Sequence, residues 1–157
     1  PYLRIGLGGV VIAGLLVLLG SRYGGAGQEM IAQAMAGQAL PWDFLVKLCL
    51  TALTIAAGFK GGEIIPGMVI GACLGCTLAP LLGMDPGFGG AVGMIALFCG
   101  MVNCPLSAIL LGVELLGGEG ILYYAVAAAV SYLLSGYSGL YSGQQFSQSK
   151  LEPERID

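Results

Sequence analysis

The sequence predicts an all-α membrane protein, a bundle of tilted and broken transmembrane helices. Hydrophobic residues make up 57% of the 157 residues and charged residues only 10%, whereas about a quarter of a soluble domain is charged. Between Ile64 and Glu119 the acidic and basic side chains are Asp85 and Glu114, so the helices of that stretch lack the polar faces that water requires. The 28 glycines are costly in water-exposed helices but let helix backbones approach closely in lipid.

Apolar runs give the expected helices, which lie within residues 5–20, 44–57, 64–84, 88–102, 106–116 and 121–134. The stretch 24–38 is small and polar and fits a short helix with loops that face the interface. Pro41-Trp42-Asp43 marks one helix start, because Pro suits a first turn, Trp favours headgroup depth and Asp favours the positive helix end. Few runs reach the ~20 residues of a perpendicular span, and several are interrupted by Gly or Pro. Non-helical backbone persists at membrane depth only where protein buries it or where it lines a wet cavity, which is typical of transporters and pores.

The start of the sequence indicates that we should expect an excised or processed part of a longer protein. It opens on Pro-Tyr-Leu-Arg without an initiator Met or a secretory signal pattern. We expect residues 1–143 to form the membrane-embedded part and residues 144–157 to form a polar C-terminal tail.

A net charge of −3 without histidine gives no basic footprint for nucleic acid. The five cysteines are odd in number and lie in or beside apolar runs, which favours small packing residues over a disulfide framework.

The segment 58–66 (GFKGGEIIP) interrupts two apolar runs and is the first candidate for chemistry. Gly61 and Gly62 allow a tight turn, and a proline three residues after Glu63 suits the opening turn of a helix. The amides of Glu63, Ile64 and Ile65 would then be free donors at a positive helix end, an arrangement that binds a dehydrated anion without a full charge. The pattern is weak by itself and is also typical of a plain loop that caps a helix.

Three side chains are further candidates. Glu63 could cap the helix or titrate and exchange with an anion. Glu114 is costly in lipid and indicates a functional group or a buried pair, and a water-facing residue near a helix end is the alternative. Glu63 and Glu114 are therefore the candidate titratable or gating residues. Tyr141 follows the last apolar helix, either as an aromatic-belt residue or as a phenol that donates a hydrogen bond to an ion.

Small residues at every fourth position predict a packing face on the helix after the turn. They are Gly67, Gly71, Gly75 and Ala79. Cys73 and Cys76 fall on one face of the same helix, but a metal site needs further ligands and the chain has no His. We therefore expect no metal, no cofactor and no catalytic residue.

Taken in order, these motifs resemble the C-terminal half of the ClC family of chloride channels and proton-coupled chloride antiporters. The resemblance covers nearly all of residues 3–151. Its motifs are the segment 58–66, the glycine-striped helix, Asn103-Cys104-Pro105-Leu106, Val113-Glu114 and Gly139-Leu140-Tyr141-Ser142.

The resemblance implies an anion site and partners. Residues 62–66 correspond to the family's G-x-F-x-P motif, so the amides of Glu63 and Ile64 would bind the central anion, and the Tyr141 hydroxyl would contact the same ion. The helices over 105–116 and 121–134 match two that form much of the family's homodimer interface. The family's motifs G-[KR]-E-G-P, with the gating glutamate, and G-S-G-I-P do not occur here. They would lie in a missing N-terminal half, and the whole would be a multi-pass protein of a bacterial inner membrane, in contact with the lipid bilayer.

Two departures bear on the ion. Ile64 replaces the usual Phe of the motif, which a backbone site tolerates. Glu63 resembles the fluoride/proton-exchanging branch, which has G-E-V-T-P here, but Ile65 lacks the hydroxyl of that branch's Thr. The expected function is chloride transport, by a voltage-gated-type channel or a chloride/proton antiporter, and a fluoride/proton antiporter is the alternative. Two alternatives come from other functional classes. One is a non-transporting membrane scaffold subunit, and the other is an intramembrane enzyme or redox protein.

Overall fold

The computed structural model describes residues 2–137, 139–141, 143 and 150. The elements assigned in these residues are all helical. The chain divides into two compact units, Pro1–Met94 and Ile95–Asp157, and the boundary falls inside one helix, α5 (Pro86–Val102). The expected boundary between an embedded part and a tail after residue 143 stays a prediction, because nearly all of 144–157 lies outside the described residues.

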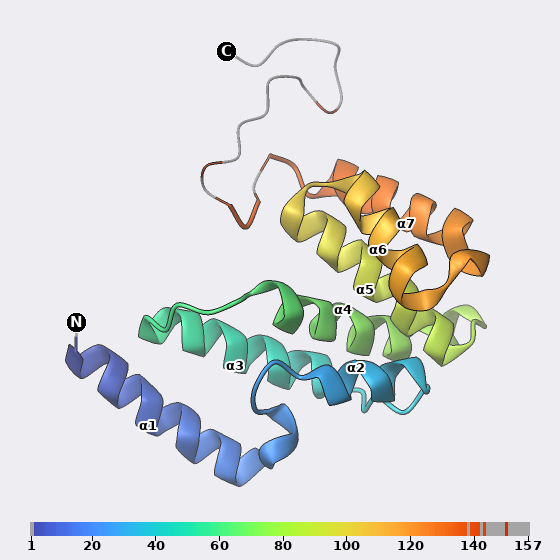
Figure 1. The fold of residues 1–157 in the computed structure, drawn as a ribbon. Helices are drawn as coiled ribbons and strands as arrows, with labels where there is room; N and C mark the ends of the chain where they lie inside the picture. The colour runs from blue at the N-terminus through green and yellow to red at the C-terminus, as the bar shows by residue number, and fades with distance from the viewer. Residues whose placement is uncertain (1, 138, 142, 144–149, 151–157) are drawn as a thin grey trace. The chain divides into compact units, whose positions relative to one another are not determined.

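The first unit is built around one central helix. Its elements are α1 (Tyr2–Leu19), η1 (Ser21–Tyr23), α2 (Gln28–Met35), α3 (Asp43–Ala57), α4 (Ile64–Leu78), η2 (Ala79–Leu82) and the first part of α5 (Figure 1). Helix α4 packs against both α2 and α3, and α1 packs against α3. Residues 67–73 of α4 are all buried, whereas α1 has no buried residue in this unit.

Close packing of α4 depends on its small residues, as the sequence predicted. A methyl group at Gly75 would lie 3.0 Å from the Cα of Gly93 and would collide with the carbonyl oxygen of Gly89. A methyl group at Gly89 would lie 2.7 Å from the carbonyl oxygen of Gly75 and would collide with the Ala79 side chain. The two backbones therefore touch where the glycines face each other, which confirms the packing face.

The second unit contains the end of α5, then α6 (Pro105–Leu116), η3 (Gly118–Gly120) and α7 (Ile121–Leu134). Helices α6 and α7 pack against each other, and a methyl group at Gly112 would lie 2.9 Å from a ring carbon of Tyr124. The hydroxyl of Ser131 on α7 donates a 2.6 Å hydrogen bond to the carbonyl of Ala96 on α5. The break between α5 and α6 falls at Asn103, whose φ of 56° is left-handed, as the predicted interruption requires.

The helices follow the predicted runs to within a few residues at most ends, and the main difference in helix type lies in the run 64–84. The run 64–84 is not one α-helix, because α4 ends at Leu78 and a 3₁₀ turn, η2, continues to Leu82. Pro80 lies in this turn and has no amide for the α-helical ladder, and Gly83 ends it with a φ of 69°. By length and composition, residues Tyr2–Leu19 and Ile64–Leu82 could each cross a membrane, and the remaining apolar helices of the described chain are shorter.

Candidate functional site

The turn between α3 and α4 is shaped by the end of α3. Gly58 has a φ of 97°, and the amides of Gly58 and Phe59 bond the carbonyls of Ile55 at 2.9 Å and Thr54 at 3.3 Å. This pair of bonds closes the C-terminus of α3. The left-handed glycine is thus Gly58, and neither of the glycines expected to form the tight turn, at 61 and 62, has a positive φ. Both of those glycines are exposed and have open space where a side chain would lie.

The start of α4 presents unpaired amides. The first helical hydrogen bond runs from the amide of Gly67 to the carbonyl of Glu63, at 3.1 Å. In the described part of the chain the amides of Glu63, Ile64 and Ile65 have no acceptor, and Pro66 has no amide. The Glu63 side chain makes no capping hydrogen bond, so the capping alternative is not observed. Three donors therefore remain at the positive end of a 15-residue helix.

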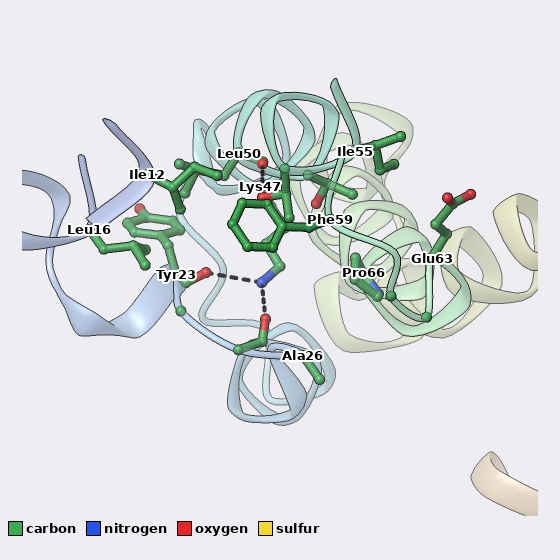
Figure 2. A pocket seen from close by; sticks show the side chains of 16 residues that line it. Ile12, Leu16, Tyr23, Ala26, Lys47, Leu50, Ile55, Phe59, Glu63 and Pro66 are labelled. Carbon is green, nitrogen blue, oxygen red and sulfur yellow. Dashed lines mark hydrogen bonds between the residues drawn. The ribbon is translucent and has the colours of Figure 1, made fainter. Parts of the chain in front are cut away.

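This turn is one wall of a cavity of about 440 Å³ in the first unit (Figure 2). Helix α1, the loop after η1, and α3 form its other walls. Lys47 lines the cavity although its side chain is only 3% exposed. Its ammonium donates hydrogen bonds of 3.0 Å and 2.9 Å to the carbonyls of Tyr23 and Gly25. Glu63 is the acidic residue among those that line the cavity.

A buried carboxylate holds this region together. Asp43, in the first turn of α3, is fully buried. It forms an ion pair with Arg22 and accepts hydrogen bonds of 2.7 Å from the Tyr23 hydroxyl and 2.9 Å from the Leu40 amide. Burial and the hydrogen bond to Asp43 raise the pKa of the Tyr23 phenol above its ordinary value. The carboxylate therefore fixes the loop that carries the acceptors of Lys47.

Sequence reasoning did not single out Lys47. Its signal was available, because Lys47 is the charged residue inside the otherwise uncharged run 44–59, and a charge in an apolar helix is a default functional hypothesis. What the sequence could not show is that Tyr23 and Gly25, more than twenty residues earlier, supply its acceptors.

Tyr141 and Glu114 belong to the second unit. The amide of Leu140 donates a 2.8 Å hydrogen bond to the carbonyl of Met101, which ties the segment before Tyr141 to the end of α5. The Tyr141 side chain is 51% exposed. Glu114 is exposed on α6 and forms no ion pair within the described residues. Its titratable role stays a prediction.

The cysteines form no cluster with other ligands in the described residues. Cys73 and Cys76 are buried and free, and no group of three His, Cys, Asp or Glu side chains that could hold a metal ion is found in the part that the structure describes.

A family model and the similar curated proteins point to the same family. The family model described as "Voltage gated chloride channel" matches residues 1–136. A chloride/fluoride channel protein of Pseudomonas syringae pv. tomato is 40% identical over 155 residues, which cover 94% of this chain and 34% of that protein. The H(+)/Cl(-) exchange transporter ClcA of Yersinia pestis bv. Antiqua (strain Angola) is 32% identical over 120 residues, which cover 69% of this chain and 25% of that protein.

A solved structure agrees with these relatives. The crystal structure of a CLC-type fluoride/proton antiporter matches with a TM-score of 0.83 and 34% identity, over 88% of this chain and 35% of that one. The match confirms the predicted fold class, an all-α bundle of the ClC type. The chain spans about a third of the length of the first of these curated relatives and of this structure.

Proposed function

The chain belongs to the voltage-gated chloride channel family, and from this premise we propose that the protein of which it is part transports chloride across a membrane. Membership also confirms the predicted localisation, a multi-pass protein of the bacterial cell membrane. The similar proteins are named as channels, transporters and antiporters rather than as enzymes, and the ion in their names is chloride, fluoride or both. Either a channel or a proton-coupled exchanger would satisfy the proposal.

The observation that carries the proposal is the set of unpaired amides at the start of α4. The amides of Glu63, Ile64 and Ile65 lie where the helix dipole favours negative charge, and no side chain occupies them. Amide donors hold a dehydrated halide without the trapping that a full positive charge would cause. The Glu63 carboxylate would repel an anion when ionised, so its protonation can release that repulsion and open the site. We assign Glu63 a gating role on this ground, and Gly62 forms the open approach to the amides.

Tyr141 completes the proposed site through the family resemblance. Its phenol is exposed in the second unit and can donate a hydrogen bond to an ion. Its contact with the anion held by the amides is part of the proposal and rests on the matching motif around residues 139–142.

Fluoride is the alternative ion because of one residue. Glu63 occupies the position that is acidic in the fluoride/proton-exchanging branch, whereas Ile65 lacks the hydroxyl of that branch. A site built from backbone amides alone distinguishes the two anions by size and dehydration cost, and a side-chain hydroxyl would add a specific donor. We place chloride first because that donor is missing.

The proposed partners are the lipid bilayer, the N-terminal half of the same protein and a second copy. In the second unit, apolar side chains of α6 and α7 remain exposed. Examples are Leu106 at 77%, Leu110 at 68%, Leu122 at 75% and Val126 at 64%. An exposed apolar face of this kind must meet lipid or protein. We propose that the homodimer forms through helices 105–116 and 121–134, and that no nucleic acid binds.

A flux assay tests the proposed function. The purified full-length protein is reconstituted into liposomes that contain chloride and fluoride, and release of both ions is followed with ion-selective electrodes. Release of chloride above the level of protein-free liposomes is expected. Release of fluoride alone would favour the alternative ion, and release of neither would support the scaffold reading and refute transport.

A further inference from the structure

The cavity in the first unit has one feature that the turn does not explain, a buried cation at the end formed by α3 and the loop after η1. Lys47 and Glu63 are the charged residues that line the cavity. They lie far apart along it, because Lys47 is in the second turn of α3 and Glu63 follows the C-terminus of that helix. The eleven steps along the helix from Lys47 to Gly58 rise about 16 Å at ~1.5 Å per residue. Figure 2 shows the Glu63 carboxylate directed away from the Lys47 end.

The charge around Lys47 is not balanced by the residues that the structure describes. Asp43 is the nearby buried acid, but it pairs with Arg22 and forms no ion pair with Lys47. The Arg22–Asp43 pair is neutral, so the cluster retains the single positive charge of Lys47. A buried ammonium without a counter-charge is unfavourable, because burial removes its hydration. Two carbonyl acceptors offset part of that cost and favour the charged form, while an ammonium has three hydrogens to donate.

The loop that wraps the ammonium is shaped to leave room for it. Gly27 has a φ of 86°, and a methyl group there would lie 3.2 Å from both Cε and Nζ of Lys47 and 3.0 Å from Val69. The cavity beside it has about 440 Å³, and a liquid water occupies ~30 Å³, so a halide fits together with part of its hydration shell. The cavity as a whole is partly open, carries a buried cation at its Lys47 end and is large enough for an inorganic anion.

We propose that the Lys47 end of this cavity is a second anion site, which receives a partly hydrated halide before it reaches the amides at the start of α4. The inference rests on the proposed transport function and deepens it. A full charge captures the anion from dilute solution, and the neutral amides accept it after further dehydration. The two acceptor carbonyls weaken the hold of Lys47 on the ion, so the halide is not trapped there.

The test uses the full-length protein in liposomes and three variants. Lys47→Met removes the charge and keeps an apolar stem, Lys47→Arg keeps the charge, and Arg4→Met removes a positive charge from an exposed position in the same unit. The half-saturating anion concentration, the maximal flux and the melting temperature are measured for each. We expect Lys47→Met to raise the half-saturating concentration about tenfold, because a unit charge at close range in a partly buried site acts on this scale. Lys47→Arg should stay within about twofold of wild type because it keeps the positive charge, and Arg4→Met should do so because an exposed charge is screened.

The alternatives give different results. If Lys47 only ties the loop to α3, or pairs with an acidic side chain from the rest of the protein, Lys47→Met lowers the melting temperature and leaves the half-saturating concentration unchanged. That result, or an equal rise in Arg4→Met, overturns the second site while wild-type flux still supports the proposed function. Absence of wild-type flux refutes the proposed function itself.

A measurement on the unaltered protein covers the case in which Lys47→Met does not fold. Crystals of the full-length protein are soaked in bromide, and the anomalous signal is mapped. A bromide peak within hydrogen-bonding distance of the Lys47 ammonium is expected. An empty site, or a carboxylate in that place, would overturn the inference.

Discussion

Replacing Ile64 by proline removes one amide donor from the start of α4 and leaves the helix its other bonds. Ile64 is the first residue of α4, a position that proline favours because no helical hydrogen bond is lost there. The preceding residue, Glu63, has φ −90° and ψ −17° and would have to shift toward extended values before a proline. The melting temperature of the full-length variant is therefore measured alongside its transport.

The size of the effect follows from the kind of bond that is lost. A hydrogen bond to a charged group contributes about 1.5–3 kcal/mol. At about 1.4 kcal/mol for each factor of ten, loss of the Ile64 amide should raise the half-saturating anion concentration by about tenfold to a hundredfold. The matched control, Ile64→Ala, shortens the side chain and keeps the amide, so its half-saturating concentration should stay near the wild-type value.

Anion efflux from liposomes over a range of anion concentrations measures both variants. The reasoning is refuted if folded Ile64→Pro transports with the wild-type half-saturating concentration. It is equally refuted if Ile64→Pro and Ile64→Ala shift by the same amount, because the side chain rather than the amide would then bind the ion.

Three further predictions concern the same protein. Tyr141→Phe removes a phenol donor to the anion, a hydrogen bond worth about 1.5–3 kcal/mol, so it should raise the half-saturating anion concentration by about tenfold to a hundredfold, and an unchanged value would exclude contact with the ion. Glu63→Gln removes the titratable group at the turn, so anion flux should no longer respond to a pH gradient, and retained coupling would place the gate elsewhere. Gly75→Ala puts a methyl group 2.9 Å from the carbonyl carbon of Gly89, so unfolding should become easier by about 1–3 kcal/mol, measured as a lower melting temperature. Gly6→Ala, with open space around it, is the control and should melt as wild type.

The helices could be predicted from the sequence because apolar runs and their breakers are local signals. The last run, 121–134, coincides with α7, and Asp43 marks the start of α3 one residue before the run expected there. The end of α4 was predicted too late, because Pro80 lies in an apolar run whose hydrophobicity conceals the change to a 3₁₀ turn. Hydrophobicity indicates that a segment is buried in lipid or protein, whereas the α-helical hydrogen bonds end where Pro80 lacks an amide.

The candidate site could be predicted in part. The turn before Pro66 is recognisable because glycine and proline bracket it, and its amides are unpaired wherever a helix begins there. At the Lys47 end the charge in an apolar helix was a visible signal, but its surroundings could not be predicted, because its acceptors are main-chain carbonyls of Tyr23 and Gly25 in a glycine-rich loop. Main-chain acceptors leave no side-chain signature, and their position depends on the bonds that Arg22 and Tyr23 of η1 make to Asp43.

The central claim is that main-chain amides at the start of α4 bind the anion. Amide resonances of the full-length protein, labelled at the isoleucine nitrogens, test it most directly when chloride is titrated at constant ionic strength. The account predicts saturable shifts for Ile64 and Ile65 and none for Ile70, which is buried within the same helix. Equal shifts at all three residues, or no saturable shift at Ile64 and Ile65 with chloride or with fluoride, would contradict it.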